Sequence, residues 1–117
     1  MTRLLAALFL ALAALPTPST AYAAELVFVE VMGCVYCIRF NRQMADAYQA
    51  SETGKQVPLR RVNLRQRWPA DLRNVDRPPY TPVFILVENG AEIGRFNGYT
   101  NPQRFKRELA SLLGRPR

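Results

Sequence analysis

Two cysteines separated by two residues, Cys34 and Cys37, constrain the fold of this chain more than any other feature. They follow residues 26–31, an almost continuous run of β-branched, aromatic and aliphatic side chains that is typical of a strand buried on both faces. Met32 and Gly33 interrupt this run, and a helical pattern begins at Cys34. The sequence therefore predicts an α/β domain in which a thiol pair occupies a strand-to-helix junction.

The remaining composition restricts the chemistry that this pair can support. The 117 residues include no His, which excludes an imidazole general base, a Cys–His catalytic pair and a His-ligated metal site. Two Cys are too few for a four-thiolate zinc site or a framework of several disulfides. Hydrophobic residues make up 49% of the chain, which is enough for the packed core of one domain. The two cysteines are therefore expected to act as a pair.

The first 23 residues show the pattern of a signal peptide. Arg3 is followed by an unbroken apolar run at residues 4–15, a proline-containing break and a small-x-small pattern that ends at Ala23. Twelve apolar residues are too few to cross a bilayer, which takes about 20. We therefore expect cleavage after Ala23 and export of residues 24–117 to the periplasm, with the net charge reduced from +7 to +6 by the loss of Arg3. In such an oxidising compartment a thiol pair is redox-active by default, and the positive charge is not expected to serve a nucleic acid.

The helix that begins at Cys34 is predicted to hold the two thiols in different environments. Residues 51–54 are expected to end it. Cys37 lies on its apolar face and is expected to point inward, whereas the sulfur of Cys34 is expected to be exposed. The apolar residues that share this face are Cys37, Phe40, Met44, Ala47 and Tyr48.

Two weaker elements are predicted after this helix. A strand is expected at residues 57–62, and a short helix at residues 69–73 with Pro69 at its first position. The first strand, the helix and this second strand form a β-α-β unit, which favours a parallel pair of strands.

The C-terminal part of the chain is predicted to be a hairpin followed by a helix. Strands at residues 83–88 and 91–97 flank Asn89-Gly90, the dipeptide that a two-residue type I′ turn requires. Asn101 is expected to cap the last helix, and Gly114 to occupy the position after it. The order is therefore β-α-β-α-β-β-α, with a central mixed sheet flanked by helices. The apolar stripe of the last helix consists of Phe105, Leu109, Leu112 and Leu113.

Thiol–disulfide exchange is the chemistry expected of Cys34 and Cys37. The free N–H groups and the positive dipole end of a helix stabilise a thiolate, so the pKa of the Cys34 thiol is expected to be lowered and Cys34 to be the nucleophile. Cys37 would then resolve a mixed disulfide by attacking Cys34. Two alternatives stay open. One is a structural disulfide, whose four-residue loop gives only about 2 kcal/mol, and the other is a two-thiolate Cu(I) site.

The arrangement of motifs resembles the thioredoxin superfamily. The motifs that carry the resemblance are Gly33, the Cys34–Cys37 pair, Thr81-Pro82, the Asn89-Gly90 hairpin and Gly98. The chain lacks the extra N-terminal strand and helix of thioredoxin proper, so the resemblance implies an α/β domain with the minimal thioredoxin-like fold. It is most similar to the small periplasmic thioredoxins encoded with the Sox sulfur-oxidation system.

The resemblance also implies roles for residues around the cysteines. Pro82 matches a cis-proline beside the active-site disulfide, and Thr81 matches the residue whose backbone pairs with a bound partner. Gly33 stands where thioredoxin has Trp, and Tyr36 between the cysteines either shields the sulfurs or contacts a partner. These four residues are candidates for substrate binding.

One acidic residue is a further candidate for the catalytic machinery. Phe28 occupies the position at which thioredoxin has a buried Asp that accepts a proton from the second Cys. Glu30 is the only charged residue within the first strand. If that strand is buried on both faces, the pKa of Glu30 should rise and its carboxylate could carry the proton of Cys37; alternatively, Glu30 meets water or pairs with an Arg.

As a whole, the resemblance implies an exported thiol–disulfide oxidoreductase with no metal and no cofactor beyond the Cys34–Cys37 disulfide. We expect a monomeric reductant that receives electrons from a membrane thiol transporter and keeps cysteine-containing periplasmic proteins, such as a sulfur-oxidation carrier, reduced. The nearest alternative is a disulfide oxidase or isomerase of the same fold, which only the reduction potential distinguishes. The alternative from another class is a Cu(I)-binding module of the metallochaperone type.

Overall fold

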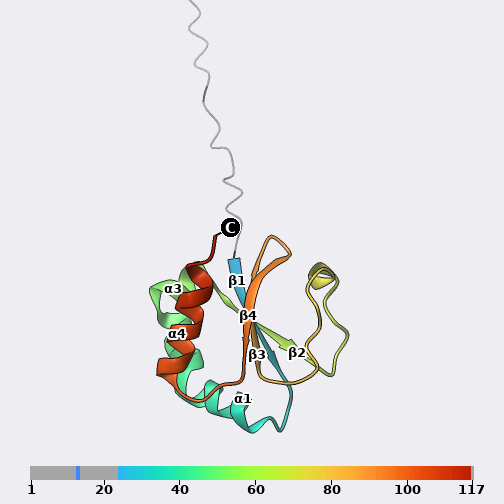
Figure 1. Ribbon diagram of the computed structural model, residues 1–117, viewed down its shortest axis with the longest axis vertical. Coiled ribbons are helices and arrows are strands. Elements are labelled where there is room, and N and C mark those ends of the chain that lie inside the picture. The colour runs from blue at the N-terminus through green and yellow to red at the C-terminus, as the bar shows by residue number, and fades with distance from the viewer. Residues whose placement is uncertain (1–12, 14–23, 117) are drawn as a thin grey trace, which may run out of the picture.

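A mixed four-stranded sheet forms the centre of the domain (Figure 1). The computed structural model describes residues 13 and 24–116, so the predicted signal peptide, apart from residue 13, lies outside the described residues. The sheet order is β2-β1-β3-β4, with β1 parallel to β2 and β3 antiparallel to both β1 and β4. This arrangement confirms the predicted parallel β-α-β unit and antiparallel hairpin. The strands are β1 (Ala24–Glu30), β2 (Leu59–Asn63), β3 (Val83–Glu88) and β4 (Ala91–Asn97).

Strand β1 is buried on both faces, as its continuous apolar run predicts. Leu26 and Phe28 point toward the helices and belong to one core cluster. Val27 and Val29 point the other way and belong to a second, aliphatic cluster. All four side chains are fully buried. The junction that carries the cysteines is therefore attached to a strand whose central residues are fully buried.

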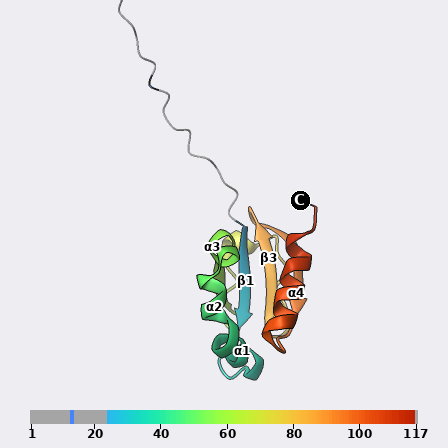
Figure 2. The same cartoon turned by 90° about the vertical axis from the view of Figure 1, so that its left-hand side faces the viewer.

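Helices cover one face of the sheet, and a single turn covers the other. Figure 1 shows α3 and α4 on one side of the strands, and Figure 2 shows α1, α2 and α3 following one another from bottom to top alongside β1. Among the described residues, no helix is long and apolar enough to cross a membrane. The helical elements on this face are α1 (Val35–Phe40), the π-helical η1 (Asn41–Ala45), α2 (Asp46–Ala50), α3 (Glu52–Gln56) and α4 (Pro102–Leu113).

The predicted apolar stripe of the first helix is wrong at one position. Ala47 is exposed, and Ala45 is buried instead. Because η1 is π-helical, with i→i+5 hydrogen bonds, each of its residues turns the chain through a smaller angle than in an α-helix. The inward face therefore shifts toward Ala45, while Tyr48 stays buried one turn later.

The predicted end of the helix at residues 51–54 is only partly correct, because α2 ends at Ala50 but α3 begins two residues later, at Glu52. Ser51 caps α3, and its Oγ accepts a hydrogen bond from the N–H of Gly54 at 3.0 Å. A Cβ atom on Gly54 would lie 1.9 Å from the carbonyl oxygen of Tyr48, so only glycine fits at this close approach. The hydroxyl of Tyr48 donates to the carbonyl of Val57 at 2.6 Å, and burial raises its pKa to about 12.

On the opposite face, the predicted short helix is only a 3-10 turn. It spans η2 (Ala70–Leu72), and Pro69 precedes the turn instead of occupying its first position. The indole N–H of Trp68 donates to the carbonyls of Leu72 and Val75, at 2.9 and 3.0 Å, and this anchors the turn against the aliphatic cluster. The second strand also begins later than predicted, at Leu59, since Val57 is the C-cap of α3.

The C-terminal prediction is confirmed in its strand bounds and helix start. Asn89 and Gly90 both have positive φ, 52° and 76°, as a type I′ turn requires. The Oδ1 atom of Asn101 accepts from the N–H of Arg104 at 2.8 Å and caps α4. Gly114 directly follows α4 as its C-cap, and its φ of −82° is right-handed. Its N–H still bonds back to Ala110, so the last turn closes without a left-handed residue.

Candidate active site

Cys34 and Cys37 form a disulfide at the junction of β1 and α1, with their Cα atoms 5.2 Å apart. Cys34 is the N-cap of α1, and its Sγ accepts a hydrogen bond from the N–H of Cys37 at 3.2 Å. Cys37 is 2% exposed and belongs to the core cluster, whereas Cys34 is only partly buried. The structure therefore confirms the predicted difference in exposure. Sγ of Cys34 is therefore the sulfur atom that another molecule can reach.

The turn before the cysteines requires a glycine for its backbone. Gly33 has a φ of +84°, a conformation that L side chains rarely adopt, although no atom lies within 4 Å of the position of a Cβ. The N–H of Cys34 bonds to the carbonyl of Val31 at 3.3 Å and closes the turn. Conformation, not space, therefore disfavours a larger residue such as Trp here.

The Thr81–Pro82 peptide bond is cis, as the resemblance implied. Pro82 is buried, Thr81 is half-buried, and both directly precede β3. Because Val83 pairs with Val29 in the antiparallel β1–β3 ladder, the start of β3 lies at the same end of the sheet as the cysteine-bearing turn. The predicted substrate-binding pair and the disulfide therefore share one end of the sheet.

Glu30 does not have the buried environment that we expected for a proton carrier. Its side chain is 25% exposed, and its Oε2 accepts from Nη1 of Arg61 at 2.6 Å. The same guanidinium donates to Oδ1 of Asn41 at 2.7 Å and lies 5.5 Å from the centre of the Phe28 ring. The alternative of an Arg partner is thus the one that the structure shows. The salt bridge joins β1 to β2 just before the cysteine-bearing turn, and the hydrogen bond to Asn41 ties both strands to η1.

Large apolar side chains are exposed only around this site among the described residues. They are Met32, Val35, Tyr36, Ile38 and Tyr80. The first four lie in the cysteine-bearing turn and α1, and Tyr80 lies two residues before Pro82. The sequence analysis missed all of them except Tyr36. The available signal was that Val35 and Ile38 are apolar although they fall off the core-facing stripe of the helix.

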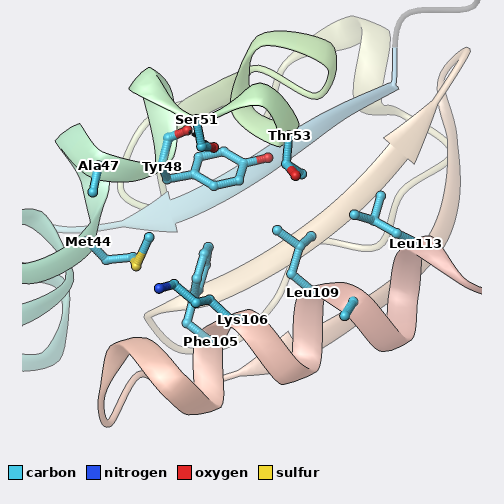
Figure 3. Close-up of a pocket in the computed structure, with 10 residues that line it drawn as sticks. Met44, Ala47, Tyr48, Ser51, Thr53, Phe105, Lys106, Leu109 and Leu113 are labelled. Atoms are coloured by element: carbon cyan, nitrogen blue, oxygen red, sulfur yellow. Dashed lines mark hydrogen bonds between the residues drawn. The ribbon is translucent and has the colours of Figure 1, made fainter.

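Residues that could hold a metal do not converge here. No group of three or more Cys, Asp or Glu side chains suited to a metal ion lies within residues 24–116. Met44, one of the two methionines near the cysteines in sequence, packs in the core cluster. A groove, shown in Figure 3, lies between the α2–α3 segment and α4 and is lined by Tyr48, Phe105 and Leu109 among others. It contains neither cysteine nor any of the predicted site residues.

The fold and the redox-competent cysteine pair define a thioredoxin-like domain, and comparison with solved structures supports this. The chain is similar to the periplasmic thioredoxin SoxS from Paracoccus pantotrophus, solved in its reduced form, with 32% identity and a TM-score of 0.73. The match covers 78% of this chain and 96% of that one. The chain therefore belongs to the thioredoxin superfamily.

More distant structures share the fold. A thioredoxin from Malassezia sympodialis is 13% identical, with a TM-score of 0.63 over 77% of each chain. Thioredoxin-2 of the malaria parasite is 16% identical, with a TM-score of 0.53 over 76% of this chain and 82% of that one. No protein-family model and no curated protein matches the sequence.

Proposed function

We propose that this protein is an exported thiol–disulfide oxidoreductase that reduces cysteine-containing proteins of the periplasm. The observation that carries this proposal is the asymmetric Cys34–Cys37 disulfide, with an accessible sulfur at the helix N-cap and a buried one a turn later. The similarity to a periplasmic thioredoxin and the signal-peptide pattern of residues 1–23 support the compartment. Partners include a sulfur-oxidation carrier protein, and electrons come from a membrane thiol transporter.

The geometry supports a two-step exchange that needs no further cofactor. In the reduced protein, the Cys37 N–H that bonds Sγ of Cys34 would stabilise a thiolate there. This thiolate attacks a sulfur of the partner disulfide, and the other partner sulfur leaves as a thiolate that takes up a proton. Cys37 then loses its proton and attacks Sγ of Cys34 in this mixed disulfide. The partner sulfur that was bonded to Cys34 leaves as the second thiolate, and the Cys34–Cys37 disulfide is restored. Two electrons pass to the partner.

The direction of electron flow is tested by the reduction potential of the Cys34–Cys37 couple. A reductant should equilibrate with glutathione at a potential near that of thioredoxin, about −270 mV, while strong disulfide oxidants lie near about −120 mV. We expect a value close to the first, read from the fraction of oxidised protein in buffers of defined glutathione redox state. A potential near the second would identify a disulfide oxidase and contradict the proposed direction.

We further propose that Glu30 carries the proton of Cys37 during the resolving step, despite its ion pair with Arg61. Glu30→Gln is expected to slow disulfide exchange about tenfold at neutral pH and to change the pH profile of the rate. Asn41→Ala is the control, because it removes a bond to Arg61 and keeps the carboxylate. Stopped-flow exchange rates and urea unfolding would be measured for both variants. An unchanged rate and pH profile in Glu30→Gln would show that Glu30 serves the ion pair alone.

A further inference from the structure

A stripe of exposed side chains begins beside Cys34 and continues along α1 and η1. Val35, Ile38, Arg39 and Arg42 follow Cys34 at helical spacing, and with Gln43 they line a groove with a volume of about 280 Å³. The stripe is apolar beside Cys34, where Val35 and Ile38 are 64% and 42% exposed. It becomes cationic one to two turns further on. A partner segment that brings its cysteine to Cys34 and extends along this helix must cross both the apolar and the cationic part of the stripe.

The two guanidinium groups of this stripe form no ion pair within the part of the chain that the structure describes. Neither Arg39 nor Arg42 forms an ion pair with a carboxylate among the described residues, although Arg60, Arg61 and Arg95 all do. Arg39 instead lies over the ring of Tyr36, with its Cζ atom 5.4 Å from the ring centre. Both positive charges are therefore available to an external anion.

The far side of this groove is joined to the segment around Pro82. The hydroxyl of Tyr99 donates to Oε1 of Gln43 at 2.9 Å, which fixes the groove-lining Gln43 to the end of β4. One residue earlier, the N–H of Gly98 donates to the carbonyl of Pro82 at 2.8 Å. Hydrogen bonds thus connect the groove to the cis-proline segment that is expected to pair with a bound partner.

We propose that this groove recognises acidic partner segments, in which a Glu or Asp lies a few residues from the reactive cysteine and an apolar side chain lies between them. This inference rests on the proposed function. Arg39 and Arg42 lie roughly 8–12 Å from Cys34 along the helix axis, at 1.5 Å per residue, which corresponds to about two to four residues of an extended chain. A second copy of this chain is a poor occupant, because it presents the same positive charge.

Two matched peptides test this preference. Each has one central cysteine as a mixed disulfide with neutral 2-thiopyridine, a valine beside it, and either Glu or Gln three residues away on both sides. Reduced protein attacks the peptide sulfur and releases pyridine-2-thione, and Cys37 then frees the peptide thiol as the protein disulfide forms. The rate of thione release at low salt is expected to be about fivefold higher for the Glu peptide, and high salt should reduce this ratio.

The matched charge variants assign the preference to the groove. Arg39→Gln/Arg42→Gln should bring the ratio of the two rates close to one. Lys106→Gln/Arg107→Gln removes the same charge from exposed positions on α4, and should leave the ratio as in the wild type. Equal rates for both peptides in the wild type, or a ratio that survives Arg39→Gln/Arg42→Gln, would overturn the inference and leave the proposed function standing. A wild-type protein that releases thione from neither peptide, while dithiothreitol releases it from both, would overturn both.

Discussion

Cys34→Ser is expected to lower the rate of disulfide reduction roughly 10³-fold or more, because a serine hydroxyl does not replace a thiolate as the attacking group. The buried position of Cys37 prevents it from taking over, since a partner sulfur cannot reach a side chain that is 2% exposed. The measurement is turnover of a 2-thiopyridyl peptide disulfide with a dithiol donor, compared with the reaction of the donor alone.

Cys37→Ser is the matched variant, because it removes the same cross-link and keeps the outer thiol. Once it has been reduced and the dithiol donor has been removed, it should release about one equivalent of thione and then stop, since the mixed disulfide on Cys34 has no resolving thiol. Mass spectrometry should show the peptide attached to this variant and no adduct on Cys34→Ser. In the cell envelope, the same variant should hold natural partners covalently. Attachment of peptide to Cys37 of the Cys34→Ser variant at the wild-type rate would reverse the assigned roles.

Phe84→Ala should lower the free energy of unfolding by about 3–5 kcal/mol, which is a large fraction of the stability of a small domain. Phe84 is fully buried in β3, and its ring stacks between those of Phe28 and Phe96, at centroid distances of 5.1 and 4.9 Å. The rings of Phe40 and Phe105 meet it nearly edge-on at 4.8 and 5.2 Å. Removing the ring leaves a cavity whose aromatic walls cannot collapse to fill it.

Urea unfolding of the oxidised protein measures this loss. Tyr80→Ala is the control, because it removes a ring of similar size from a half-exposed position and should change stability by about 0.5 kcal/mol or less. Phe84→Leu keeps part of the volume and should lose about 1–2 kcal/mol, so it stays measurable if Phe84→Ala does not fold. A loss in Phe84→Ala no greater than in Tyr80→Ala would show that the aromatic cluster is not the main source of stability.

Features that depend on short-range rules could be predicted from the sequence. The Asn89-Gly90 turn was predictable because both residues tolerate the positive φ that the turn demands. The different exposures of Cys34 and Cys37 followed from helical spacing and from the position of Cys34 at the helix start. The order of the elements followed from such local patterns, and the thioredoxin-like fold was implied by the resemblance that the motifs carry.

Features that depend on distant contacts could not be predicted in the same way. The salt bridge of Glu30 joins it to Arg61, a residue 31 positions away on the neighbouring strand, so local patterning gave only the possibility of an Arg partner. Gly54 suggests a helix terminator in the sequence, but it lies inside α3. A glycine is needed there because the carbonyl of Tyr48 leaves no room for a Cβ. The π-helical turn in η1 also carries no sequence signal that we recognise, and it alone moved Ala47 out of the core.

Because Cys37 is buried within the aromatic cluster, the packing of the core affects the reduction potential of the Cys34–Cys37 couple. Folding and oxidation form a thermodynamic cycle. The difference in unfolding free energy between the dithiol and disulfide forms therefore equals, as a free energy, the difference in reduction potential of the Cys34–Cys37 couple between the folded and the unfolded chain. About 1.4 kcal/mol of such a difference corresponds to 30 mV. A substitution beneath the cysteine pair that loosens packing around one form more than the other therefore shifts the reduction potential of the Cys34–Cys37 couple without contacting either sulfur.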